Sequence, residues 1–304
     1  MTRHRDHLPL AGLLNLSVIY VVWGSTYLAI RVAVREGAGW GPFWLGASRV
    51  FVAAAILLLL AAARRARIRP SRRELAVVAV SGLLMWVGGN GGVIWAEQRV
   101  DSGLAALIVG AMPMWIALME GVLDRRAPSL LLVLSLIAGF VGLGVLTAPM
   151  LRGGVSADLL GVAVIIFGTV CWAAGSILLH RRPVGLEPTV LSGLQQLIGG
   201  LGFAALGLLF REPMPAPTTE AWIAWGYLLV FGSLLAFTAF IHALRLLPAT
   251  IVMTYAYVNP VFAVLLGWLI LSEPITPFTL LGTALIMVGV YGVFSEKGKR
   301  FTQE

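Results

Sequence analysis

Ten apolar stretches divide this 304-residue chain and leave room for little else. A helix of roughly 20 residues, rising about 1.5 Å per residue, crosses the hydrocarbon core of a bilayer, which is about 30 Å thick. Composition agrees, because 59% of the residues are hydrophobic, 12% are charged and the mean hydropathy is +0.91. We therefore predict an all-α integral membrane protein with ten transmembrane helices. The predicted spans are Leu10 to Val34, Phe43 to Ala63, Glu74 to Ala96, Gly103 to Leu123, Ser129 to Pro149, Asp158 to His180, Thr189 to Phe210, Ala221 to Leu244, Ala249 to Leu271 and Pro277 to Phe294.

Positive charge is concentrated in alternate gaps between these spans. Residues 1–9, the even-numbered gaps and residues 296–304 hold 16 of the 22 Lys and Arg residues, whereas the odd-numbered gaps hold five. Because basic residues stay on the side that is not translocated, both tails are predicted to be cytoplasmic. The net charge of +8 thus reflects topology, with some attraction to anionic lipid headgroups, and does not indicate a nucleic-acid partner.

The composition argues against several other classes of protein. A single cysteine, Cys171, excludes an internal disulfide framework and a cysteine-based metal site. The aspartates are scattered, the spans contain no grouped histidines and no Gly-x-x-x-x-Gly-Lys loop is present. We therefore expect no enzyme activity, no metal, no cofactor and no ATP.

The chain repeats itself at an offset of about 147 residues. Pro113 falls on Pro260 near the middle of a fourth helix in each half, and Gly142 falls on Gly289. We predict a first unit over residues 10–149 and a second over residues 158–295. Five helices per unit is an odd number, so the units must be inverted relative to each other. Inverted repeats are typical of secondary transporters with a site near the midplane, although a duplication kept only for packing is the alternative.

Four motifs together resemble those of the ten-helix, EamA-type branch of the drug/metabolite transporter superfamily. They are Trp23-Gly24-Ser25-Thr26-Tyr27, Ser48-Arg49-Val50-Phe51, the two central prolines, and Leu271-Ser272-Glu273-Pro274 before a Gly-rich last helix. The resemblance covers roughly residues 11–295. It implies a multi-pass inner-membrane exporter of amino acids or other small metabolites with a central cavity lined by both halves. It selects no single substrate, since that branch includes exporters of aromatic amino acids, of threonine and homoserine, and of organic cations.

The two prolines are candidate elements of the cavity. A proline inside a helix removes a backbone hydrogen bond, and in lipid the freed carbonyl needs another partner. Pro113 and Pro260 are therefore predicted to shape the cavity or a hinge, or else to form kinks that serve only packing.

The third span carries a second candidate group. Trp86, Asn90, Val93 and Glu97 recur at helical spacing on one face, and the glycines at 88, 89, 91 and 92 allow close packing or deformation of the helix. Asn90 is expected to face the bundle interior, either in an interhelical hydrogen bond or in the cavity.

Aromatic side chains near mid-depth indicate an amphipathic cavity wall. Taken singly, each is better explained by packing than by binding, but together they favour a substrate with an apolar or aromatic portion. The full set of cavity candidates is Trp23, Trp86, Asn90, Met112, Pro113, Trp172, Gln195, Tyr255, Tyr257, Asn259 and Pro260.

Arg49 is the only charged residue well inside a predicted span. A charge at that depth costs at least about 2.5–3.5 kcal/mol, so it should face protein or water or extend toward the surface. We expect a structural role at the helix ends, with binding of a substrate carboxylate as the alternative. The corresponding region of the seventh span has Gln195 and Gln196 instead.

The carboxylates lie in gaps, in tails or close to span ends, so a proton carrier at the centre is missing. Only Glu97 and His242 are candidates for a proton path, and both are placed near surfaces. We expect a secondary transporter that exports amphipathic metabolites, most of all amino acids, by alternating access without a proton gradient. A proton-coupled efflux transporter for drugs or organic cations is the alternative, and a channel is a further one. The expected partners are a small-molecule substrate and the lipid bilayer, with a monomer as the functional unit and a dimer left open.

Overall fold

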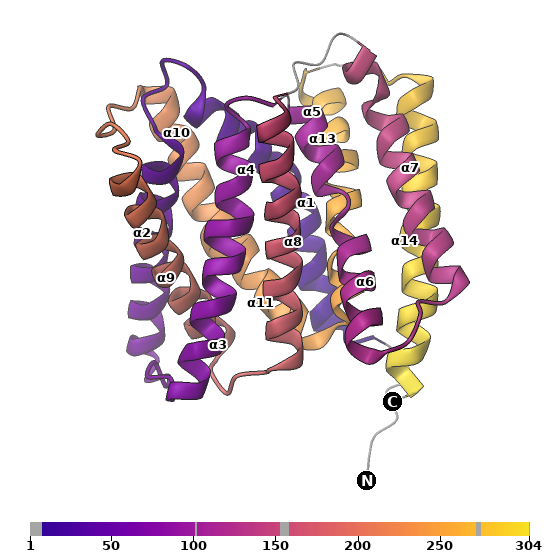
Figure 1. Cartoon of the computed structure of the whole chain (residues 1–304), viewed down its shortest axis with the longest axis horizontal. Helices are drawn as coiled ribbons and strands as arrows, with labels where there is room; N and C mark the ends of the chain where they lie inside the picture. Colours follow the sequence, from indigo (N-terminus) through magenta and orange to yellow (C-terminus); the bar gives the residue numbers. More distant parts are fainter. Residues whose placement is uncertain (1–7, 101, 153–157, 272–274, 304) are drawn as a thin grey trace.

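The computed structural model describes residues 8–100, 102–152, 158–271 and 275–303, which form one bundle of long helices (Figure 1). Helix α1 begins and α14 ends on the same side of the bundle, here called the terminal face. In chain order the helices, with η marking π-helices, are α1 (Leu10–Val34), α2 (Pro42–Ala63), α3 (Arg72–Gly82), η1 (Leu83–Asn90), α4 (Gly91–Ala96), α5 (Ser102–Val109), α6 (Met112–Asp124), α7 (Leu130–Arg152), α8 (Leu159–Arg181), α9 (Pro188–Leu209), α10 (Thr219–Tyr227), η2 (Leu228–Ala236), α11 (Phe237–Leu246), α12 (Ala249–Val252), α13 (Tyr255–Leu271) and α14 (Pro277–Gln303).

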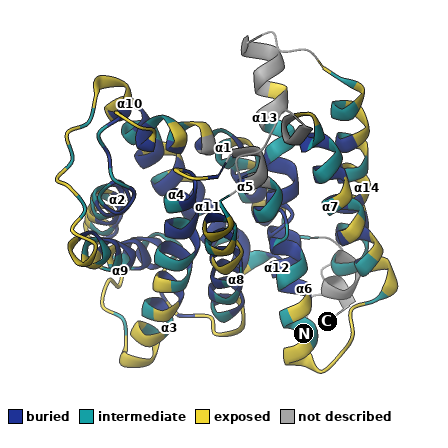
Figure 2. Cartoon of the chain, turned by 45° about the horizontal axis from the view of Figure 1, so that its top comes forward, coloured by how far each residue is buried: buried dark blue, intermediate teal, exposed yellow. Residues whose placement is uncertain are grey.

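Nine stretches of helix within the described residues are long and apolar enough to cross a membrane. The ninth predicted span is the exception, because it is divided into α12 and α13. Buried side chains gather in the middle of the bundle, whereas its outer surface exposes large apolar residues such as Leu60, Leu130 and Leu209 (Figure 2). Apolar side chains facing outward are what a lipid environment requires. The chain is thus a multi-pass membrane protein, and the predicted all-α fold class is confirmed.

The two halves share the same irregularities. The third span of each half contains a π-helix, η1 in the first half and η2 in the second, and the fourth span of each half is interrupted. The packing is also reciprocal, since α1 lies against η2 and α11 while α8 lies against η1, and α2 pairs with α9 as α7 pairs with α14. This arrangement is that of two repeats inverted relative to each other.

Pro113 does not kink a continuous helix, contrary to the sequence-based expectation. The chain leaves the helix after Val109, turns at Gly110 and Ala111, and starts again at Met112, so that Pro113 lies in the first turn of α6. The missing N–H costs nothing there, because the first N–H groups of a helix have no partner within the helix. Pro260 does lie inside α13, but the interruption of that span falls at Met253 and Thr254.

Helices α7 and α14 approach each other through glycine. A Cβ atom added to Gly142 would lie 2.7 Å from the backbone N of Ile286 and 2.8 Å from the carbonyl O of Gly282, and one added to Gly289 would lie 2.6 Å from the N of Gly139. No side chain separates the two backbones at these points. Gly144, only two residues from Gly142, faces open space.

We predict that Gly142→Ala lowers the thermal stability of the protein in detergent. The new methyl group must push α14 away, and overpacking of this kind costs about 1–3 kcal/mol. The matched control is Gly144→Ala, which has room for its methyl group and should stabilise the helix by about 0.5–1 kcal/mol. Equal melting temperatures for the two variants would show that the α7–α14 contact is looser than described.

Candidate substrate cavity

A cavity lies between the two halves of the bundle, from mid-depth toward the face opposite the terminal face. The space between atoms there, part of which is open to the surroundings, amounts to about 640 Å³. Helices of both repeats supply its walls, as expected for a site at the contact of two inverted units. The lining residues are Trp23, Thr26, Ile30, Arg49, Trp86, Gly89, Asn90, Val93, Val109, Met112, Trp172, Gly232, Tyr255 and Asn259.

One wall of the cavity is aromatic. Trp23 of α1 meets Trp172 of α8 edge to face at a centroid distance of 5.6 Å, and it meets Tyr255 of α13 at 4.9 Å. Trp23 and Trp172 lie at corresponding positions of α1 and α8, since both the helix starts and the two tryptophans are 149 residues apart, so equivalent side chains of the two halves contact each other. Phe240 packs behind them, 5.3 Å from Trp23 and 5.5 Å from Trp172. Such a cluster presents a rigid apolar surface to whatever enters the cavity.

The glycines of the third span allow the close helix packing that positions the aromatic wall. A Cβ atom on Gly89 would lie 2.9 Å from Cε3 of Trp172, so only glycine lets η1 approach α8 while keeping the indole in position. Gly88 makes the equivalent approach to Cys171, at 2.8 Å. Both predicted roles of the glycine-rich segment, close packing and deformation of the helix, are therefore present, and the deformation takes the form of the π-helix η1.

Arg49 reaches into the same space from α2. Its side chain is 3% exposed, its Nη2 donates a hydrogen bond to Oδ1 of Asn90 at 2.6 Å, and its guanidinium lies 5.5 Å from the ring centre of Trp86. Both contacts are inside the third span and not at a helix end. We predicted that Arg49 connects helix ends, but its contacts join α2 to the third span.

The structure brings together eight of the sequence-predicted residues at the cavity. Within the described part of the chain these are Trp23, Arg49, Trp86, Asn90, Met112, Trp172, Tyr255 and Asn259.

Four other candidates lie elsewhere. Gln195 is fully buried between α9 and α3, where its Nε2 donates to Oγ of Ser81 at 2.8 Å. Tyr257 points away from the cavity and donates to the carbonyl of Leu136 in α7 at 3.1 Å. Pro113 and Pro260 are not among the lining residues. Depth along a span, on which these predictions were based, does not say which face of a helix a residue occupies.

Neither of the proton-path candidates lines the cavity. Glu97 directly follows α4 and is only 2% exposed, and no described residue forms a hydrogen bond with its carboxylate, so it is enclosed by protein although it lies at a span end. The Nδ1 of His242 is 2.9 Å from the carbonyl of Thr238, one turn earlier in α11. No carboxylate or imidazole is found among the described residues around the cavity.

Several lining residues were not predicted to lie at the cavity, namely Thr26, Ile30, Val109 and Gly232. Gly89 and Val93 were named in the candidate group of the third span but not among the cavity residues. Phe237 and Phe240, which back the aromatic wall, were missed too, although their spacing of one helical turn was a usable signal.

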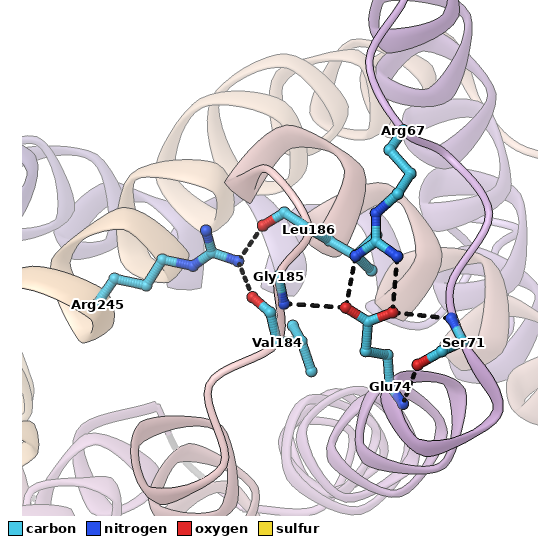
Figure 3. A network of polar contacts seen from close by, with 7 residues as sticks. All are labelled: Arg67, Ser71, Glu74, Val184, Gly185, Leu186 and Arg245. Carbon is cyan, nitrogen blue, oxygen red and sulfur yellow. Dashed lines mark hydrogen bonds and ion pairs between the residues drawn. The ribbon is translucent and has the colours of Figure 1, made fainter.

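At the terminal face, a polar network joins the first repeat to the second (Figure 3). The Glu74 carboxylate accepts hydrogen bonds from Arg67 at 2.5 and 3.0 Å, from the Ser71 N–H at 2.8 Å and from the Gly185 N–H at 3.0 Å. Arg245 of α11 donates to the carbonyls of Val184 and Leu186, on either side of that glycine. The loop between α8 and α9 is therefore held from both sides where the two halves meet.

Comparison with known proteins identifies the family. The model of the EamA-like transporter family matches residues 10–148 and 159–295. The chain belongs to the EamA-like transporter family. It is 33% identical to the uncharacterized inner membrane transporter YedA of Escherichia coli (strain K12), over 95% of this chain and 91% of that relative. It is 22% identical to the uncharacterized transporter YoaV of Bacillus subtilis (strain 168), over 92% of this chain and 95% of the relative.

A solved structure shares the fold. A crystal structure of another protein superposes with a TM-score of 0.77 at 20% sequence identity, covering 95% of this chain and 98% of that one. The transporter role of the chain thus agrees with an internal cavity between two inverted repeats. One of the motifs that suggested the family, at residues 271–274, lies largely outside the described residues.

We predict that Glu74→Gln opens the terminal face. An amide cannot hold the Arg67 guanidinium and two backbone N–H groups as a carboxylate does, so the contact between the repeats should weaken. The readout is the labelling rate of a Thr26→Cys thiol in a Cys171→Ala background, with an impermeant maleimide applied on the side of the terminal face. It should rise severalfold. Arg72→Gln, which alters an exposed arginine of the same helix, is the control, and an equal rate in both variants would contradict the prediction.

Proposed function

We propose that this transporter exports small amphipathic metabolites, most of all amino acids with an aromatic or other neutral side chain, by alternating access. The observation that carries the proposal is the aromatic cavity between the two repeats, with Trp23, Trp172 and Tyr255 on one wall. An indole or phenol offers both apolar area and a polar group, and that combination suits a molecule with an apolar and a polar end. The lining also includes a guanidinium and amides, so the site is neither purely apolar nor built for a polyhydroxylated sugar.

The location and orientation of the protein are part of the proposal. We place it in the inner membrane, as the name of the Escherichia coli relative says of that protein. The 16 to 5 distribution of basic residues supports a cytoplasmic terminal face. Export then means that substrate enters from the terminal face and leaves on the opposite side.

Contacts on both faces support alternating access. The Glu74 network joins the repeats at the terminal face, while at the opposite face Glu212 accepts hydrogen bonds from the N–H groups of Phe43 at 3.1 Å and Trp44 at 2.7 Å. These last two groups are the free donors at the start of α2, where a carboxylate is favourable. Each face thus has polar contacts that a moving repeat can make or break.

The proposal is tested by transport into proteoliposomes of labelled phenylalanine, tryptophan, leucine and threonine. We predict that Trp172→Ala raises the KM for the aromatic substrates roughly tenfold, because an aromatic pair contributes about 0.5–1.5 kcal/mol beyond its buried area. Trp222→Ala is the control, since Trp222 is 48% exposed on the outside of the bundle. Failure to move any amino acid would overturn the proposal, and steady single-channel currents would favour a channel.

The cavity also bears on energy coupling. A proton carrier must be reachable from both sides in turn, and the lining residues include no carboxylate or histidine among the described residues. Substrate flux down its own gradient requires no such group.

We therefore predict that counterflow of amino acids persists at equal pH on both sides, both in the wild type and in Glu97→Gln and His242→Ala. The measurement is counterflow in proteoliposomes, repeated with an imposed pH gradient. If that gradient drives accumulation of substrate, and either substitution abolishes the accumulation while sparing counterflow, the residue concerned belongs to a proton path. That outcome would restore the proton-coupled alternative.

A further inference from the structure

Arg49 carries a charge that no acidic residue balances. Among the described residues it forms none of the ion pairs, and every other residue around the cavity is uncharged. The amide oxygen of Asn90 and the ring of Trp86 compensate the guanidinium in part. A guanidinium has five N–H donors, and its Nε is buried without a hydrogen-bond partner.

The other unsatisfied polar atoms of the lining residues are also donors. The indole Nε1 atoms of Trp86 and Trp172 are buried and have no hydrogen-bond partner within the described residues. A buried donor left unpaired costs about 1–3 kcal/mol, so three of them around one cavity make it short of acceptors. A ligand that brings negative charge and several acceptor oxygens meets that need.

The equivalent position of the second repeat has no such shortage of acceptors. The region of α9 that corresponds to Arg49 has Gln195 and Gln196, because α2 and α9 each begin at a proline and have 22 residues. Nε2 of Gln195 donates to Oγ of Ser81 at 2.8 Å, and Nε2 of Gln196 donates to Oγ of Ser192 and to the carbonyl of Ser233, both at 3.1 Å. The second repeat therefore uses its amide donors for contacts between helices. The first repeat keeps a charged donor at the cavity.

We propose that Arg49 binds the carboxylate of the transported substrate. A guanidinium and a carboxylate form paired, charge-assisted hydrogen bonds in one plane, and the low dielectric of surrounding apolar side chains strengthens them. The apolar end of the substrate then lies against Trp23, Trp172 and Tyr255. The same fixed charge repels organic cations that lack an acidic group. This inference rests on the proposed function and adds the polar end of the substrate to it.

The test compares phenylalanine, leucine and threonine with their amides, which keep the ammonium group and the side chain but replace the carboxylate. Binding is measured by competition on the purified full-length protein in nanodiscs. In the wild type, each amino acid that binds should bind about tenfold or more tightly than its amide, because an unpaired buried charge is left in the amide complex. Arg49→Gln should bring that ratio to within about twofold of one. Arg31→Gln removes an exposed arginine of α1 and should leave the ratio unchanged.

A second variant covers the case in which Arg49→Gln fails to fold. Asn90→Asp places a carboxylate at the position that now accepts from Arg49 at 2.6 Å, so it keeps the arginine and neutralises it from within the protein. It should also abolish the preference for the acid over the amide. Equal binding of acid and amide by the wild type, or a preference that survives in both Arg49→Gln and Asn90→Asp, would overturn the inference while transport of amino acids still supports the proposed function. Absence of both binding and transport of every amino acid would overturn the proposed function itself.

Discussion

The need of every backbone group for a hydrogen bond inside lipid governs this structure. Continuous helices meet that need wherever the chain faces lipid. The departures, which are η1, η2 and the interruptions at residues 110–111 and 253–254, occur in the third and fourth spans, and these spans supply much of the cavity wall. Irregular backbone is tolerated there because protein or water can satisfy it. The constraint that makes most of the bundle uniform thus also places its irregular segments in the spans that line the cavity.

The two repeats are equal in backbone and unequal in chemistry. Trp23 and Trp172 are counterparts and meet at the cavity, so the duplication contributes directly to the aromatic wall. Arg49 faces the cavity, whereas the corresponding region of α9 has Gln195 and Gln196, which are used in helix packing. An inverted repeat with two identical polar sites would place two charges near one substrate. A single charged site gives the cavity one polar end and one apolar end.

Much of this architecture is predictable from the sequence, since hydrophobic length and the parity of the repeat depend on local composition. The tryptophans near the middle of the first, third and sixth spans were correctly placed at the cavity, because the span boundaries also give the depth of each residue. Gln195 and Tyr257 were misplaced because each lies at the right depth on the wrong face, and in helices that are apolar all round no periodicity marks that face. The break at Gly110 and Ala111 was mistaken for a kink at Pro113, since a proline two residues into a helix has the same local sequence as one in its middle. The π-helices were not predicted as such, because they depend on how α8 and α1 pack against the third spans.

The glycine contact between α7 and α14 has a mechanical consequence. Two helices that touch backbone to backbone at Gly142 and Gly289 cannot slide past each other by a fraction of a turn without a collision. This pair, which lies at one edge of the bundle, therefore behaves as a single rigid unit (Figure 1). In the proposed alternating-access cycle, the helices around the cavity would therefore move relative to this pair, and the change of shape would fall on the loops that connect them to it.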